Sequence, residues 1–292
     1  MNLVFVHGRA QGLKDPIELK KEWINTLKIG LEKSGLTLPI SEENISFPFY
    51  GEKLDDLVRD GLRTVEGIIT KGAEINSRDV RFFQDFLLEI SENADISTEE
   101  ISEANDVVIT EKGPLNWPWV QAILRTLDQR TRWSEASIKR FTRDVVLYLT
   151  AANVKDIVNN EVMKSIKNKP CVVVGHSLGS IICYNILRDN SDLNICKFIT
   201  IGSPLGLKSV KNYLRTPIKM PDCIKHGWYN AYDERDVVAL NPLDRTYFNI
   251  SPSIENDNHV RNSTSNRHGI RGYLNDKVIA KTIYNALRND CT

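Results

Sequence analysis

A serine stands between two glycines at the point where a short apolar run of the sequence ends. The run covers residues 171–174, and Gly175-His176-Ser177-Leu178-Gly179 follows it directly. Gly-x-Ser-x-Gly is the spacing of the nucleophile elbow, in which a serine lies on a sharp turn between a strand and a helix. Small neighbours are needed because the strand and the helix approach each other closely there. Ser177 is therefore the candidate nucleophile, and the alternative is an ordinary glycine-containing turn with a capping serine.

A serine hydroxyl is a weak nucleophile unless a base lies beside it, so this interpretation needs a later histidine. His268 lies in the polar segment Arg-His-Gly-Ile-Arg-Gly-Tyr, just before the last predicted helix, and is the favoured base. His259 lies nearer the last predicted strand and is the alternative. For either residue, a solvated loop histidine is the simpler interpretation.

The histidine in turn needs an acid that follows a strand and precedes it in the chain. The predicted strand at residues 227–232 is followed by Asp233, Glu234 and Asp236. Asp236 is favoured, because the Val-Val-Ala after it can anchor its loop on the core while the carboxylate faces the histidine. Asp233 is the second candidate and could instead brace the turn, and Glu234 is the third. The competing interpretation makes all three a solvated turn.

An acyl-transfer site also needs backbone N–H groups directed at the oxygen that becomes negative in the transition state. The residue after the nucleophile supplies one such group, which here is the amide of Leu178. The second would come from the turn after the first strand, where His7-Gly8-Arg9 makes the Arg9 amide the candidate donor. The Arg9 guanidinium could also meet a substrate carboxylate or phosphate, or be an ordinary surface group.

These residues depend on a framework of strands and helices that alternate along the chain. Continuous apolar runs predict strands at residues 2–6, 44–50, 171–174, 196–201, 227–232 and 246–250. Helical spacing of apolar residues predicts helices at residues 16–30, 178–188 and 276–288. Strands that are apolar throughout, separated by helices, indicate an α/β fold with a mostly parallel central sheet covered on both faces.

The pattern changes between residues 52 and 150, where strand signals disappear and amphipathic helices follow one another. Helices are predicted at residues 79–91, from residue 117 and at 138–151, and the helix at 153–166 returns to the core. We therefore predict a core of residues 1–51 and 151–292 and a helical cap or lid inserted at 52–150. The aromatic and apolar residues of the insertion could line an acyl channel, although their helical spacing favours packing inside the insertion; they are Phe82, Phe83, Phe86, Leu87, Trp117 and Trp119.

The composition narrows the range of partners and locations. The 292 residues include 38 basic and 38 acidic side chains, so the net charge of zero argues against general binding to nucleic acid or anionic membranes. No run approaches the ~18 apolar residues of a membrane-spanning helix, and the first apolar run is too short for a signal peptide. The five cysteines are scattered and form no Cys-x-x-Cys pair, which predicts reduced thiols and a cytoplasmic protein.

Taken together, four segments resemble the α/β-hydrolase superfamily in its lipase-like and esterase-like branch. They are FVHGR near the N-terminus, VVVGHSLGS, YDERDVV and HGIRGYL. The resemblance implies a triad of Ser177, His268 and Asp236, an oxyanion hole from Arg9 and Leu178, and a cap at the position of the insertion. It implies no metal and no organic cofactor.

The function expected from these features is hydrolysis of a carboxylic ester or thioester through an acyl-enzyme on Ser177. The substrate would be a small-molecule ester or, as the alternative, an acyl lipid cleaved by a lipase or phospholipase. A hypothesis of another class is a hydrolase-fold binding or effector module with little catalysis, since a fold alone does not prove activity. The sequence predicts no oligomeric state.

Overall fold

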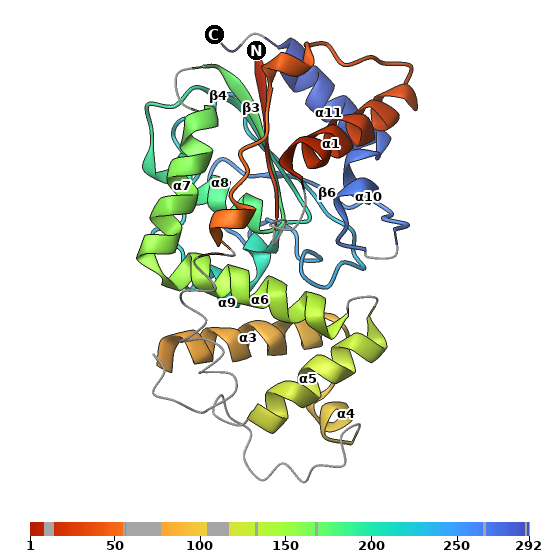
Figure 1. Cartoon of the computed structure of the whole chain (residues 1–292), viewed down its shortest axis with the longest axis vertical. Helices are drawn as coiled ribbons and strands as arrows, with labels where there is room; N and C mark the ends of the chain where they lie inside the picture. Colours follow the sequence, from red (N-terminus) through yellow and green to blue (C-terminus); the bar gives the residue numbers. More distant parts are fainter. Residues whose placement is uncertain are drawn as a thin grey trace.

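A parallel β-sheet forms the centre of the molecule in the computed structural model (Figure 1). The structure describes residues 1–8, 15–54, 56, 77–103, 117–131, 134–166, 169–264, 267–289 and 291. Within these residues six strands pair in the order β2-β1-β3-β4-β5-β6, and each neighbouring pair is parallel. The strands are β1 (Asn2–Val6), β2 (Ile45–Ser46), β3 (Cys171–His176), β4 (Ile195–Ile201), β5 (Trp228–Ala231) and β6 (Glu255–Asp257). The predicted α/β fold with a parallel sheet between helices is confirmed.

The strands are apolar throughout because both faces of the sheet are buried. Along β1, Leu3 and Phe5 belong to one hydrophobic cluster, whereas Val4 and Val6 belong to the cluster on the opposite face. Successive side chains of a strand point to opposite faces, so a strand covered on both sides needs apolar residues at every position.

Two helices with well-defined N-terminal caps, α1 (Pro16–Glu32) and α11 (Lys277–Arg288), pack together on one face of the sheet. The carboxylate of Asp15 accepts hydrogen bonds from the amides of Ile17 (2.7 Å) and Glu18 (3.0 Å), and Asp276 caps α11 in the same way. Such caps satisfy the free amides of a first helical turn, which is why both helices begin where they do. The short helix α10 (Ile270–Leu274) precedes α11 and also contacts α1.

The opposite face is covered by α7 (Ala152–Ile166) and α8 (Leu178–Asp189). Val154, Val158, Val162 and Ile166 form a buried stripe on α7, four residues apart. Helix α8 is buried along nearly its whole length, because it follows β3 directly and lies over the centre of the sheet.

Four further helices lie beyond the carboxyl ends of the strands, in the lower part of Figure 1. We call them the helical block: α3 (Ser77–Asn93), α4 (Thr98–Glu103), α5 (Trp117–Arg130) and α6 (Glu135–Thr150). Phe82, Phe86, Leu87 and Trp119 are buried in it, and the rings of Phe82 and Phe86 stack with centroids 5.6 Å apart. Phe83 is half-buried against the same cluster, and the side chain of Trp117 lies outside the described part. The described side chains of this set therefore pack within one hydrophobic cluster, which continues onto one face of the sheet.

The predicted strand at residues 246–250 is wrong. This segment forms a turn, and the sixth strand is β6, a few residues later. The carboxylate of Asp244 accepts hydrogen bonds from the amides of Thr246 (2.8 Å) and Tyr247 (3.1 Å), and its carbonyl accepts from the amide of Phe248. Aspartate side chains that bind amides two and three residues later favour turns, and here this local effect outweighs the apolar run. Strand β2 is also shorter than predicted, at two residues.

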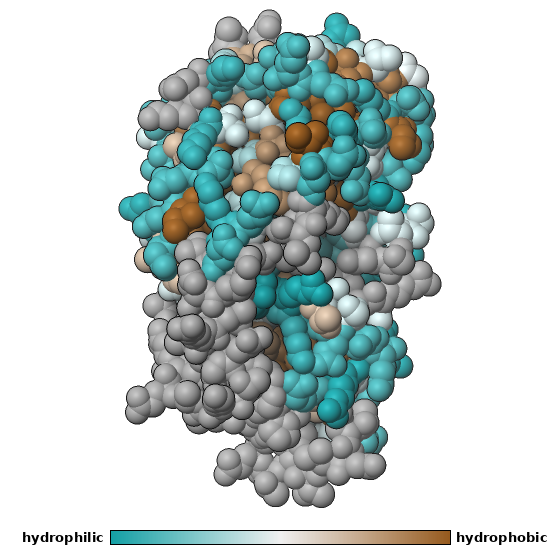
Figure 2. Space-filling view, viewed as in Figure 1, coloured by the Kyte–Doolittle hydropathy of each residue, from teal (hydrophilic) through white to brown (hydrophobic). Residues whose placement is uncertain are grey.

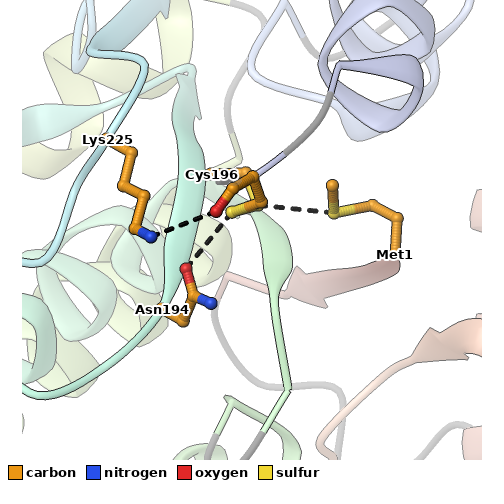
Figure 3. Close-up of a disulfide and its surroundings, with 5 residues drawn as sticks. Met1, Asn194, Cys196 and Lys225 are labelled. Atoms are coloured by element: carbon orange, nitrogen blue, oxygen red, sulfur yellow. Dashed lines mark hydrogen bonds between the residues drawn. A yellow bond between two sulfur atoms is a disulfide. The ribbon is translucent and has the colours of Figure 1, made fainter.

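The expectation of reduced cysteines fails at one pair, because Cys196 and Cys291 form a disulfide (Figure 3). Their Cα atoms lie 5.1 Å apart although 95 positions separate them in the sequence. Both chain ends lie at the end of the sheet opposite the helical block (Figure 1), which brings the C-terminal segment to the start of β4. Lys225 donates a hydrogen bond to the carbonyl of Cys291 (3.0 Å). Cys171, Cys183 and Cys223 are buried free thiols.

The described surface is predominantly hydrophilic in the view of Figure 2, with small apolar areas over the sheet domain. The exposed large apolar residues include Ile17 and Ile29 on α1. Among the described helices, none has both the length and the apolar character needed to cross a bilayer.

Candidate functional site

The strand order places two loops beside each other at the carboxyl end of the sheet. From β1 the chain passes through α1 to β2 on one side, whereas β3 pairs with the other side of β1. Helix α1 lies on one face of the sheet and α8 on the other, so the loops after β1 and β3 diverge. In open α/β sheets such a switch point is the usual place for a binding site. His7-Gly8 follows β1 there, and Ser177 follows β3.

Ser177 occupies the turn between β3 and α8 in a backbone conformation that L-residues rarely adopt. Its φ is 58° and its ψ is −129°. A residue other than glycine in this region carries strain that the surrounding structure must hold. The Ser177 amide donates to the carbonyl of Ile201 on β4 (3.3 Å), and the Ser177 carbonyl accepts from the hydroxyl of Ser180 (2.6 Å). These bonds hold the turn in its strained form.

The glycines beside Ser177 allow three backbone segments to meet. A Cβ atom on Gly179 would lie 2.5 Å from the carbonyl oxygen of His7 and closer still to that of Val6. A Cβ on Gly175 would lie 2.8 Å from the Cα of Ser180, on the first turn of α8. The start of α8 is therefore pressed against the end of β1, which explains the Gly-x-Ser-x-Gly spacing.

Two hydrogen bonds join Ser177, His268 and Asp236 into a chain. The Nε2 atom of His268 lies 2.6 Å from Ser177 Oγ, and its Nδ1 atom lies 2.6 Å from Asp236 Oδ2. All three side chains are buried, and Ser177 is only 2% exposed. A carboxylate accepts hydrogen bonds, so Nδ1 carries the proton and Nε2 is left to accept one from the serine hydroxyl. The structure thus brings together the favoured candidates for nucleophile, base and acid.

The buried carboxylate of Asp236 has further donors that hold it in place. The hydroxyl of Tyr273 donates to Oδ2 (2.8 Å), and the amide of Val238 donates to Oδ1 (3.3 Å). Burial, and then the charge of Asp236, raises the pKa of Tyr273 well above its usual value, so the phenol remains a donor. A buried charge is tolerated when it is paired and hydrogen-bonded in this way.

The other two acids of the loop have different partners. The carboxylate of Asp233 accepts from the Nε (3.0 Å) and Nη2 (2.9 Å) of Arg235 and from the amide of Asn262 (2.7 Å). Burial alone would raise the pKa of Asp233, but these hydrogen bonds outweigh it and the pKa is lowered. Asp233 therefore braces the loop, while Glu234 is exposed and accepts a hydrogen bond from Asn258.

The alternative histidine lies away from this cluster. The side chain of His259 is 83% exposed, and its Nδ1 lies 2.7 Å from Asp257 at the end of β6. His259 is therefore a solvated loop histidine, the simpler interpretation of its place in the sequence.

His176, the residue before the serine, supports the backbone of His268 and was given no role from the sequence. Its Nε2 lies 2.9 Å from the carbonyl oxygen of His268, so this nitrogen carries the proton. Burial, and then the neighbouring His268, lowers the pKa of His176 well below its usual value, and the ring stays neutral. Tyr273 was also missed, although it belongs to the HGIRGYL segment. The contacts of His176 with His268 and of Tyr273 with Asp236 could not be predicted from residue spacing, because each joins segments far apart in the sequence.

Of the two residues expected to donate backbone amides to the oxyanion, the structure describes Leu178 but not Arg9. Leu178 is the first residue of α8, directly after Ser177, where helix amides lack intrahelical acceptors. Arg9 lies outside the described residues. Its neighbour Gly8 is placed against the serine, because a Cβ on Gly8 would lie 2.8 Å from the Cβ of Ser177.

His7 shapes the end of β1 from within the core. Its Nδ1 lies 2.7 Å from the carbonyl oxygen of Gly8, its ring stacks on Tyr50 with centroids 4.0 Å apart, and its carbonyl accepts a hydrogen bond from the Tyr50 hydroxyl. Burial lowers the pKa of His7 to about 4, so it is neutral near pH 7.

The helical block reaches the site through individual side chains. The ring of Phe141 on α6 meets the ring of His268 edge-on, with centroids 5.6 Å apart. At the end of α3, Asn93 donates to the carbonyl of Val237, next to Asp236 (2.8 Å). The carboxylate of Glu89 accepts from the amides of Lys208 (2.6 Å) and Ser209 (2.9 Å) at the start of α9 (Lys208–Lys211).

Comparison with known proteins adds no assignment to this geometry. The chain matches no protein-family model, and no curated protein matches its sequence. In the described part, no group of three or more His, Cys, Asp or Glu side chains is arranged to hold a metal ion. The class that the fold defines is an α/β protein with a parallel sheet, and the site must be interpreted from its own chemistry.

Proposed function

We propose that this protein is a serine hydrolase of the α/β-hydrolase superfamily that cleaves a carboxylic ester or thioester. The observation that carries the proposal is the pair of 2.6 Å contacts of His268, one to Ser177 and one to Asp236. Supporting it are the strained serine at the strand-to-helix turn and the chain order Ser, Asp, His.

The reaction begins when His268 Nε2 takes the proton of the Ser177 hydroxyl as the oxygen attacks the substrate carbonyl. Asp236 keeps the proton on Nδ1 and stabilises the imidazolium that forms. The imidazolium then gives its Nε2 proton to the leaving alcohol or thiol, and the acyl group remains on Ser177. A water molecule, deprotonated by the same histidine, releases the acid and restores the serine.

The negative oxygen of each tetrahedral intermediate would be bound by the amides of Leu178 and Arg9. A good donor of this kind contributes about 3–4 kcal/mol to the transition state. The start of α8, whose positive dipole end points to the serine, favours anion binding at this place.

A small ester is the substrate class that we favour over an acyl lipid. Phe82, Phe86 and Trp119, which could have lined an acyl channel, are buried in a hydrophobic cluster that continues from the helical block onto one face of the sheet. Ser177 is nearly inaccessible, so substrate entry requires side chains near it to move. Phe141, which touches the base, belongs to the helical block, and this contact is the reason to treat the block as the cap of the active site.

The test is covalent labelling with a fluorophosphonate together with hydrolysis of p-nitrophenyl acetate. The native chain should be labelled and should turn over, and Ser177→Ala should do neither while keeping its circular dichroism spectrum. Ser191→Ala is the matched control, because Ser191 is exposed after the end of α8. Labelling that persists in the Ser177→Ala variant would refute the mechanism. A folded native chain that is not labelled would favour the binding or effector module.

A further inference from the structure

A small cavity lies between the helical block and the loop that carries Asp236. Its volume is about 210 Å³. One wall comes from the ends of α3 and α5, and the other from the loop after β5 and the residue before His268. The described residues that line it are Ala94, Arg130, Thr131, Arg235, Asp236, Val237 and Arg267.

Among the described lining residues are three guanidinium groups and one carboxylate. The carboxylate, Asp236, is already bonded to His268 and Tyr273. Arg235 donates its Nε and Nη2 to Asp233, and Arg130 donates its Nε to Glu100 (3.0 Å), so both are paired with acids outside the lining. A guanidinium has five N–H donors, and within the described residues these pairs use only one or two in each arginine. The arginines therefore keep donors for a further acceptor.

Arg267 points to a missing acceptor. Its Nη1 atom is buried and has no hydrogen-bond partner among the residues that the structure describes. Leaving a buried donor unsatisfied is costly, and the cost is greater for a charged group, so such atoms are rare in folded proteins. Arg267 lines the adjoining cavity, so a small rotation of its guanidinium would bring this donor to an anion bound there.

We propose that this cavity binds a small oxyanion, a phosphate or a carboxylate, through Arg267 with Arg130 and Arg235. Guanidinium groups match both anions because their planar donors form paired hydrogen bonds to the oxygens. The volume is below the 300–1,000 Å³ or so of common small-molecule sites, which fits a single anionic group. The anion is either free in solution or part of a larger substrate or product.

The location gives this site a structural effect. Arg130 belongs to the helical block, whereas Arg235 and Arg267 belong to the segments that carry the acid and the base. A bound anion would connect the two and hold the block against the loop of Asp236. This site is distinct from the proposed oxyanion hole and does not depend on catalysis.

The test is isothermal titration of the full chain with inorganic phosphate and, separately, with acetate at constant ionic strength. We expect saturable binding of at least one anion at one site per chain. Arg267→Gln should weaken it about tenfold or more, since it removes a charge-assisted donor. Arg215→Gln should not, because that exposed arginine pairs with Asp189 outside the cavity lining.

Arg130→Gln provides a second variant on the opposite wall, in case Arg267→Gln does not fold. The inference fails if neither anion binds saturably, or if binding is unchanged in a folded Arg267→Gln or Arg130→Gln variant.

A second experiment identifies the source of the anion. The rates of hydrolysis of a neutral ester and of an ester with a free carboxylate are compared with and without phosphate. If phosphate inhibits hydrolysis of the charged ester alone, the cavity binds the carboxylate of the substrate. If phosphate inhibits neither ester selectively, the cavity binds a free anion. Loss of all hydrolysis would bear on the proposed function and leave the binding result intact.

Discussion

The sheet core and the helical block meet at the same site but contribute to it in different ways. The core supplies Ser177 after β3, Asp236 after β5 and His268 before α10, and each is held by backbone hydrogen bonds or by close backbone packing. The block reaches the site through single side chains, such as Phe141 on His268 and Asn93 on the carbonyl of Val237. Changes in the core should therefore affect the chemistry, and changes in the block should affect access to it.

The largest effect should come from the base. In His268→Ala no group remains to accept the serine proton, and kcat for p-nitrophenyl acetate should fall by about 10⁴-fold or more. His259→Ala is the matched control, and its kcat should stay within about twofold of native, since its exposed ring bonds only to Asp257 in the described structure. Equal losses in the two variants would contradict the assignment of the base.

The next effect concerns the packing that makes the elbow possible. Gly179→Ala puts a Cβ onto the carbonyls of Val6 and His7, and the free energy of unfolding should fall by about 3 kcal/mol, at the upper end for overpacking. Urea denaturation measures it. Gly35→Ala is the control for backbone angle alone, because Gly35 has a φ of 64° with no atom near its Cβ position, and should cost about 1 kcal/mol. If the two variants are equally stable, close approach is not what requires Gly179.

Low pH should lower the free energy of unfolding through His7, which is buried at the end of β1 beside the site. The pKa of His7 is about 4 in the folded chain and about 6.5 when unfolded, so between these values the unfolded state binds more protons. The free energy of unfolding should therefore fall as pH decreases from 6.5 to 4, by up to about 3 kcal/mol from this residue.

Denaturation at several pH values tests this expectation. The decrease should become smaller in His7→Asn, which cannot titrate there, and should persist in His259→Gln. An unchanged pH dependence in a folded His7→Asn variant would show that this buried histidine is not responsible.

The smallest effect should come from the helical block. Phe141→Ala removes a ring that packs edge-on against His268, so KM for bulky esters should fall by a few-fold while kcat for the acetate ester stays within about threefold. Steady-state kinetics across esters of increasing size measures the change. If Phe141→Ala lost as much kcat as His268→Ala, the helical block would contribute to the chemistry and not only to substrate access.

Much of the core could be predicted because its signals are local. Continuous apolar runs located β1, β3, β4 and β5, and the helical spacing of apolar residues located α1. The choice of Ser177, Asp236 and His268 followed from their order in the chain and from their positions next to predicted strands and helices.

What could not be predicted depends on tertiary contacts. Asp244 turns an apolar segment away from the sheet, and Tyr273 and His176 bond to segments 37 and 92 positions away. The cavity beside Arg267 needs two regions of the chain to be in contact before it exists. The turn, the two hydrogen bonds and the cavity leave no local pattern of residues in the sequence from which they could be predicted.

The bond between Cys196 and Cys291 closes a covalent ring that contains the loops of Asp236 and His268 but leaves Ser177 outside. A single protease cut between positions 236 and 268 would therefore leave both pieces attached to each other until a reductant is added. A cut between Ser177 and Cys196 would release the N-terminal fragment under denaturing conditions without any reductant. Gel electrophoresis of a nicked sample, with and without thiol, would thus report which side of the ring had been cleaved.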